Sequence, residues 1–258
     1  MSVATVSNIF EGNQMKLKEL LNEARHREDI SIEKAIELIR ANCKDALKNV
    51  ENPMWRGFRG REDAYLIQAD LGERASKNTS NYYTIILDKF LPKQGYPKRS
   101  KSIICGNNKN LDYAEGYGAV YALFPYDGVP IGICHERDIW ETKRFVIGDA
   151  PRARSIEDWN SVFERSALSD DTYENFKEDI IKHMDIHPGS EIEQIFKRPE
   201  NIDMYLEAAY SPGSLNFDLT TTAMMDQYED KDRECWLGGK CVAIQYGTWK
   251  KTSKKWGL

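Results

Sequence analysis

The chain has 258 residues, ordinary apolar and charged fractions, and a formal net charge of −5 at pH 7. Its length allows one large domain or two small ones, and thirteen Tyr and six Trp exclude a disordered chain. The acidic balance argues against a nucleic-acid grip spread over the whole surface, although a local basic patch stays open.

The sequence shows no apolar run long enough to span a bilayer, and its first residues lack the pattern of a secretory signal. Five cysteines are scattered along the chain without a C-x-x-C pair: Cys43, Cys105, Cys134, Cys235 and Cys241. We therefore expect a cytoplasmic protein with reduced, mostly buried thiols, in the host cytoplasm if the protein is viral.

Two helices open the predicted order of elements. Apolar residues at helical spacing predict the first over 15–27. The second begins at the N-cap Ser31 and should end near Asn49, ahead of Pro53. Short apolar runs then predict strands over 54–58, 100–105, 119–124 and 129–134, with a turn at 126–128 and a helix over 81–91.

The second half of the chain is predicted to be helical over 155–210, in three pieces, the last beginning with a capping box at Ser190–Glu193. S-P-G-S at 211–214 marks a break. Residues 234–244 read as a hairpin that turns on Gly238–Gly239, and the basic residues beyond Tyr246 as a frayed, solvated end. Strands separated by helical blocks favour an α+β fold over a doubly wound α/β fold.

Arg56 and Gly57 form the first candidate piece of a site. An arginine at the end of a buried strand, followed by glycine, presents a planar fork of donors that suits phosphate or pyrophosphate. The alternative is an arginine paired with a nearby acid.

Ser100 and Ser102 form the second piece. Two residues apart on a strand, their hydroxyls share one face and could orient a ribose or a carboxylate. The alternatives are a polar strand edge, or a small phosphate-binding patch made by Lys98, Arg99 and Lys101.

Asp232 and Glu234 form the third piece. At the start of a strand and next to Trp236, Glu234 could act as a base or stabilise positive charge, with Asp232 facing the same way. The alternative is a charged hairpin root.

Taken in order, W-R-G at 55–57, S-K-S at 100–102 and D-R-E at 232–234 resemble the motifs of the arginine–serine–glutamate class of ADP-ribosyltransferases of bacterial toxins and bacteriophages. Ala114 and Tyr117-Gly118 also match residues that follow the serine motif in that class. Two positions depart from the pattern, because Lys101 replaces a threonine and Asp232 replaces a glutamate or glutamine that often engages the acceptor.

The resemblance implies an ADP-ribosyltransferase-like split antiparallel sheet core over 50–150 and 215–247. A helical extension over 14–49 and a helical insertion over 151–212 complete a single domain, 1–258. It also implies NAD as substrate, without a metal, and a macromolecular acceptor, expected to be a host protein rather than nucleic acid, with no membrane partner.

The resemblance assigns roles to particular residues. Glu234, Arg56, Ser100 and Asp232 would form the catalytic set. NAD would be held by Arg56, Gly57, Ser100, Ser102, Tyr82, Tyr83 and Tyr117. The competing hypothesis is a non-catalytic, virion-associated or nucleic-acid- or protein-binding relative with the same fold. His183 and His187 have zinc-compatible helical spacing, but no third ligand is evident, so surface histidines are favoured.

Overall fold

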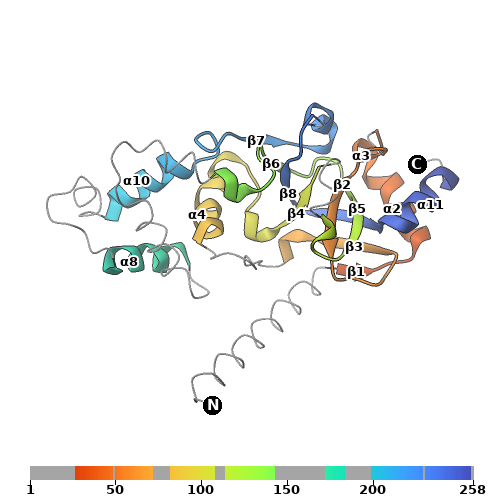
Figure 1. Ribbon diagram of the computed structural model, residues 1–258, viewed down its shortest axis with the longest axis horizontal. Helices are drawn as coiled ribbons and strands as arrows, with labels where there is room; N and C mark the ends of the chain where they lie inside the picture. The colour runs from red at the N-terminus through yellow and green to blue at the C-terminus, as the bar shows by residue number, and fades with distance from the viewer. Residues whose placement is uncertain are drawn as a thin grey trace, which may run out of the picture.

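The computed structural model describes residues 27–48, 50–71, 82–107, 114–142, 172–183, 199–228 and 230–256, which build one antiparallel sheet flanked by helices (Figure 1). The sheet has nine strands in the order β1-β3-β9-β5-β2-β4-β8-β6-β7. They are β1 (Arg27–Asp29), β2 (Met54–Phe58), β3 (Ala64–Gln68), β4 (Ser102–Gly106), β5 (Ala119–Pro125), β6 (Ile131–Cys134), β7 (Phe217–Thr220), β8 (Glu234–Gly238) and β9 (Lys240–Gln245).

Helices cover the sheet, and short 3₁₀ turns connect its strands. The helices are α2 (Ile32–Asn42), α3 (Lys44–Lys48), α4 (Tyr82–Phe90), α8 (Tyr173–His183), α10 (Pro199–Tyr210) and α11 (Tyr246–Trp256). The turns are η1 (Ala69–Leu71), η2 (Leu91–Gln94), η3 (Arg99–Lys101), η4 (Ile139–Thr142) and η5 (Thr222–Tyr228). The prediction of an α+β fold is confirmed.

The strand order requires the sheet to bend back on itself. β8 and β9 are joined by Gly239 alone, yet β4, β2 and β5 lie between them in the sheet. Across a flat sheet, four strand spacings would separate β8 from β9 by about 19 Å, beyond the reach of one connecting residue. The bend falls between β2 and β4, where a single pair, Trp55 with Gly106, links the two halves.

The predicted hairpin at Gly238–Gly239 is therefore wrong. β8 pairs with β4 and β6, whereas β9 pairs with β3 and β5, so the two strands do not pair with each other. Gly239 has φ +91°, a left-handed conformation that glycine adopts without steric cost, and it forms the corner between the halves. The turn over 126–128 likewise connects strands of different halves, β5 and β6.

Three apolar clusters hold the fold together, and strand alternation distributes side chains among them. Ile104 and Trp236 pack beneath α4, α8 and α10 in the first cluster. Cys105 and Cys235 point to the other face, into a second cluster that draws side chains from both halves of the sheet. The third cluster lies beneath α2 and α11, around Phe124. Figure 1 shows α4 beside β4, and α2 and α11 at the opposite end of the sheet.

Local signals in the N-terminal half were partly predictive. Ser31 caps α2 as expected, since its side chain accepts a hydrogen bond from the Lys34 N–H. The predicted single helix over 31–49 is in fact two, because the chain leaves helical geometry at Cys43. Arg27, expected to end a helix, begins β1. The rest of that predicted helix, over 15–26, lies outside the described residues.

The C-terminal end was predicted wrongly. Residues 246–256 form α11 rather than a frayed end, because Trp249 is buried and packs 4.9 Å from the ring of Phe124. Strands β3 and β7 were not predicted. Of the helical region predicted over 155–210, the described parts are α8 and α10. The capping box at Ser190–Glu193 lies outside the described residues.

Candidate functional site

Glu234, at the start of β8, is a fully buried carboxylate bound by a buried arginine. Its Oε1 accepts a hydrogen bond of 2.6 Å from Nη2 of Arg99, and its Oε2 accepts one of 3.3 Å from the N–H of Ile139. The two side chains are 10% and 1% exposed for Arg99 and Glu234, respectively. Strand alternation places Glu234 on the same face as Trp236, beneath α4.

Burial strengthens the attraction between Arg99 and Glu234, and it also removes the water that would otherwise solvate both charges. Charges removed from water attract each other more strongly, but each loses its hydration and needs a partner. Nε of Arg99 is buried without a hydrogen-bond partner among the described residues. The negative charge of Glu234 also reaches Cys134, whose pKa is raised mainly by burial and further by this neighbouring carboxylate.

The turn η4 connects Glu234 to the predicted Tyr83. The hydroxyl of Thr142 donates to the carbonyl of Ile139, and the Tyr83 hydroxyl hydrogen-bonds that Thr142 hydroxyl. Burial raises the pKa of Tyr83, and the nearby guanidinium of Arg99 opposes this shift. The ring of Tyr83 is 1% exposed, so it belongs to the core that supports the ion pair.

Ser100 lies beside the ion pair but not on a strand. Arg99, Ser100 and Lys101 form the 3₁₀ turn η3, and β4 begins only at Ser102. The expectation that both serines project from one strand is therefore wrong. The backbone N–H of Ser100 donates to the carboxylate of Asp88 on α4, while the Ser102 hydroxyl donates 2.6 Å to the carbonyl of Lys98.

Asp88 anchors η3 against α4. Its carboxylate is largely buried, and this burial raises its pKa, although hydrogen bonds from Ser100 act in the opposite direction. The turn directs Arg99 inward, so the hypothesis of a surface phosphate patch that includes Arg99 is wrong. Sequence reasoning had placed Arg99 in that patch and had not singled out Asp88 at all.

Arg56 and Gly57 form a separate group with Tyr117. Arg56 lies in the middle of β2 rather than at its end, and its guanidinium stacks 5.2 Å from the ring centre of Tyr117. Its Nη1 is buried without a partner among the described residues. A Cβ added to Gly57 would lie 1.7 Å from the carbonyl oxygen of Ala114, so close packing alone explains this glycine.

Sheet register relates the two groups. Trp55 pairs with Gly106, and Gly106 pairs with Glu234, so these three residues form one row across β2, β4 and β8. Paired residues share a face, and Arg56 follows Trp55, so the side chains of Arg56 and Glu234 point to opposite faces. The structure thus brings the three motifs onto neighbouring strands but does not bring Arg56 and Glu234 into one cleft.

Asn107 holds the segment that leads into β8. Its side chain donates to the carbonyls of Tyr228 and Lys231, and it accepts a hydrogen bond from the Arg233 N–H. These bonds place Asp232, which is half-buried, immediately before the strand. Tyr82 begins α4, and its side chain lies outside the described part of the chain.

A second polar cluster surrounds Arg233 near the start of β8. Nη1 of Arg233 lies 2.7 Å from Nδ1 of His135, whose Nε2 lies 2.8 Å from the carboxylate of Asp218. Because an arginine only donates, His135 accepts at Nδ1 and donates from Nε2. Burial, aided by Asp218, raises the pKa of Tyr228 to about 12. No sequence motif indicated this cluster, because its members come from separate loops and strands.

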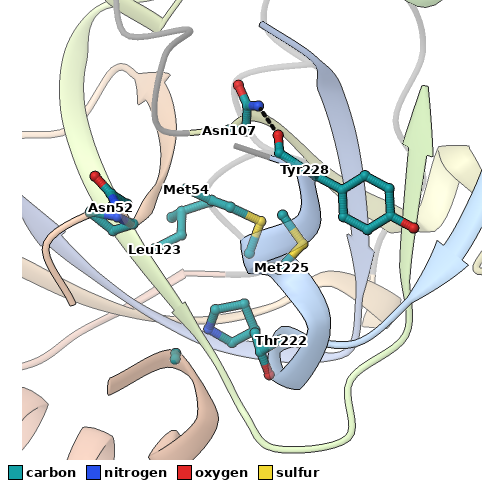
Figure 2. A pocket seen from close by; sticks show the side chains of 10 residues that line it. Asn52, Met54, Asn107, Leu123, Thr222, Met225 and Tyr228 are labelled. Carbon is teal, nitrogen blue, oxygen red and sulfur yellow. Dashed lines mark hydrogen bonds between the residues drawn. The ribbon is translucent and has the colours of Figure 1, made fainter. Parts of the chain in front are cut away.

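One pocket in the described part of the chain is lined by none of the predicted site residues. It encloses about 420 Å³ of empty space, part of it open solvent, and is lined by side chains that include Met54, Leu123 and Met225. Figure 2 shows these three around the opening, with the Asn107 amide directed at the Tyr228 carbonyl.

The described ranges contain neither a metal-binding group nor a membrane-spanning helix. No three His, Cys, Asp or Glu side chains in them gather closely enough to hold a metal ion. None of their helices is long and apolar enough to cross a bilayer.

Comparison of the chain with protein-family models, with curated proteins and with solved structures found no match.

Proposed function

We propose that the chain is a mono-ADP-ribosyltransferase that moves ADP-ribose from NAD to a macromolecular acceptor, with Glu234 as the catalytic carboxylate. The supporting observation is the row of Trp55, Gly106 and Glu234. It places the strands that carry or directly follow the three motifs side by side, although Gly57 and Glu234 are 177 positions apart in the chain. This adjacency pairs the strand that begins in the serine motif with the strand that begins at Glu234, whereas the Arg56 side chain lies on the other face of the sheet.

In the proposed reaction, the bond between C1′ of the ribose and the nicotinamide nitrogen breaks, and nicotinamide leaves with the bonding electrons. The acceptor nucleophile bonds to C1′ and loses its proton. Because positive charge develops on the ribose, a nearby carboxylate stabilises the transition state. Glu234 would accept a hydrogen bond from the ribose 2′-hydroxyl and supply this negative charge.

Arg99 would hold Glu234 ionised and in place, and Ser100, fixed to Asp88, would position η3 beside it. Glu234 is fully buried, so the mechanism requires its contact with the Ile139 N–H to open when the dinucleotide enters. Arg56 points to the opposite face of the sheet, so in this mechanism it would hold β2 against Tyr117 rather than bind the dinucleotide at Glu234.

The test is transfer of label from NAD to proteins in a cell lysate, together with release of nicotinamide. The wild-type chain should label at least one protein, and Glu234→Gln, assayed at a temperature where circular dichroism shows it folded, should lower the rate at least about 100-fold. Glu200→Gln, which neutralises an exposed carboxylate on α10, is the matched control and should keep the wild-type rate. Equal rates for wild type and Glu234→Gln would refute the assignment.

A second candidate is a non-catalytic protein of the same architecture. The burial of Glu234 and its pairing with Arg99 favour this candidate, because they are also what a structural ion pair needs. It predicts neither labelled protein nor released nicotinamide from the wild-type chain, so the same assay separates the two candidates.

A further inference from the structure

Two of the five cysteines face each other directly across the sheet. Cys105 of β4 and Cys235 of β8 are register partners, and the register pairs no other two cysteines, although all five lie in the described residues. The Cys105 thiol lies 3.6 Å from the Cys235 carbonyl oxygen, and Cys105 together with burial raises the pKa of the Cys235 thiol. Both thiols are free and point into the second apolar cluster.

The Cα spacing of register partners falls within the range of disulfides. Register partners in an antiparallel pair have Cα atoms about 4.5 or 5.5 Å apart, depending on the hydrogen-bonding position. Disulfides bridge Cα separations of about 4.4–6.8 Å, so both positions fall within the range. Cβ atoms of directly opposed residues lie about 4.5–5.5 Å apart and those of a disulfide about 3.5–4.5 Å, so the bond requires rotation of the side chains and a small approach of the two strands.

Met54 separates the pair from the pocket. Sδ of Met54 lies 3.9 Å from Sγ of Cys105, and the Met54 side chain lines the pocket (Figure 2). Cys105 is 1% exposed and Cys235 is 0% exposed, so a reagent reaches them only when the packed side chains around them, Met54 among them, move aside. A small, uncharged oxidant needs a smaller opening than a bulky thiol such as glutathione.

We propose that Cys105 and Cys235 form a redox-modification site, at which a peroxide converts the two thiols into a cross-strand disulfide. The Cys105 sulfur attacks one peroxide oxygen, the O–O bond breaks, and a sulfenic acid and water form. The Cys235 sulfur then attacks the Cys105 sulfur, the S–O bond breaks, and a second water leaves with the remaining protons. Two thiols are oxidised, and one peroxide is reduced to two waters.

The bond would tie β4 to β8 next to the row that contains Glu234. Gly106 and Glu234 each adjoin one of the two cysteines, so the disulfide would lock the strand pair that carries the carboxylate. The proposal does not depend on the proposed function, because it concerns the thiols and the register alone.

The test treats the folded full chain with hydrogen peroxide, unfolds it, alkylates the remaining thiols and counts them by mass spectrometry. We expect the count to fall from five to three, with a peptide that links Cys105 to Cys235 and returns to free thiols after dithiothreitol. Five alkylated thiols, a sulfoxide on Met54 with both thiols intact, or a link between other cysteines would each overturn the proposal.

Variants provide a matched comparison. Cys105→Ala or Cys235→Ala should keep all four remaining thiols alkylated after peroxide. Cys241→Ala removes a buried cysteine of the same cluster, whose register partners are Ile67 and Pro125, and should still form the link. Because the count on the wild-type chain is decisive by itself, a variant that fails to fold leaves the test intact.

Discussion

Removal of Arg99 would leave the Glu234 carboxylate buried without its counter-charge. The carboxylate is 1% exposed and the guanidinium 10% exposed, so solvent screens this pair very little. Removing one partner of such a pair costs about 3–5 kcal/mol of folding free energy. We therefore expect Arg99→Met, which keeps the length and apolar stem of the side chain, to lower the free energy of unfolding by about that amount.

Urea unfolding followed by circular dichroism measures this loss, and a matched variant calibrates it. Lys93 and Glu207 form an ion pair at 2.9 Å with both side chains about half exposed, at 48% and 46%. Exposed pairs contribute about 0–1 kcal/mol, so Lys93→Met should change little. The double variant Arg99→Met/Glu234→Met should recover most of the loss, because it removes both buried charges together.

The pH dependence of Arg99→Met supplies an independent check. In folded Arg99→Met, the buried Glu234 carboxylate has lost its counter-charge, so binding a proton there stabilises the folded state. In the unfolded chain, Glu234 is exposed to water and carries no proton at neutral pH. The folded state then binds more protons than the unfolded state, so stability must fall as pH rises. The deficit relative to wild type should thus be smaller at pH 5 than at pH 7. An unfolding free energy within about 1 kcal/mol of wild type at pH 7 would refute the reasoning about the buried pair.

Three further variants test local features. Burial raises the pKa of Asp88, so the stability that its protonated form contributes is present in acid and is lost as pH rises through that pKa. Asp88→Asn cannot titrate at this position and should flatten this part of the pH–stability curve, measured by urea unfolding at several pH values. Gly57→Ala forces a Cβ against a backbone carbonyl and should cost about 1–3 kcal/mol, whereas Gly213→Ala, with open space around it, should cost less than about 1 kcal/mol. Trp249→Ala should cost about 3 kcal/mol by calorimetry if α11 packs on the sheet, and the exposed Lys251→Ala should cost almost nothing; equal effects would contradict this packing.

Several elements of the fold follow from short-range patterns that a reader of the sequence can detect. Ser31 caps α2 because its hydroxyl oxygen can reach an N–H three residues away, whatever the rest of the chain does. The apolar run over 54–58 becomes β2 with its expected bounds. The predicted helix over 81–91 became α4, and the predicted strands over 119–124 and 129–134 became β5 and β6, each shifted by one or two residues at an end.

The candidate site was predictable only in part. Glu234 stands out in the sequence through the D-R-E motif and its neighbour Trp236, and the structure buries its side chain completely. Its partner could not be found in this way, because a lysine- and arginine-rich segment such as 98–101 reads as a surface. The 3₁₀ turn η3 directs Arg99 inward. Asp88, 12 residues before Ser100, fixes this turn by accepting a hydrogen bond from the Ser100 N–H.

The sequence by itself determined elements such as α2, β2 and β5, since capping, periodicity and apolar runs act over a few residues. The tertiary structure decided which strands are neighbours. Gly239 turns the chain from one half of the sheet to the other instead of closing a hairpin. As a result, β8 pairs with β4 and does not pair with β9. The partners of Glu234 and of Cys235 follow from that choice. Such partners lie more than 90 residues away, so only the packing of the whole sheet can select them.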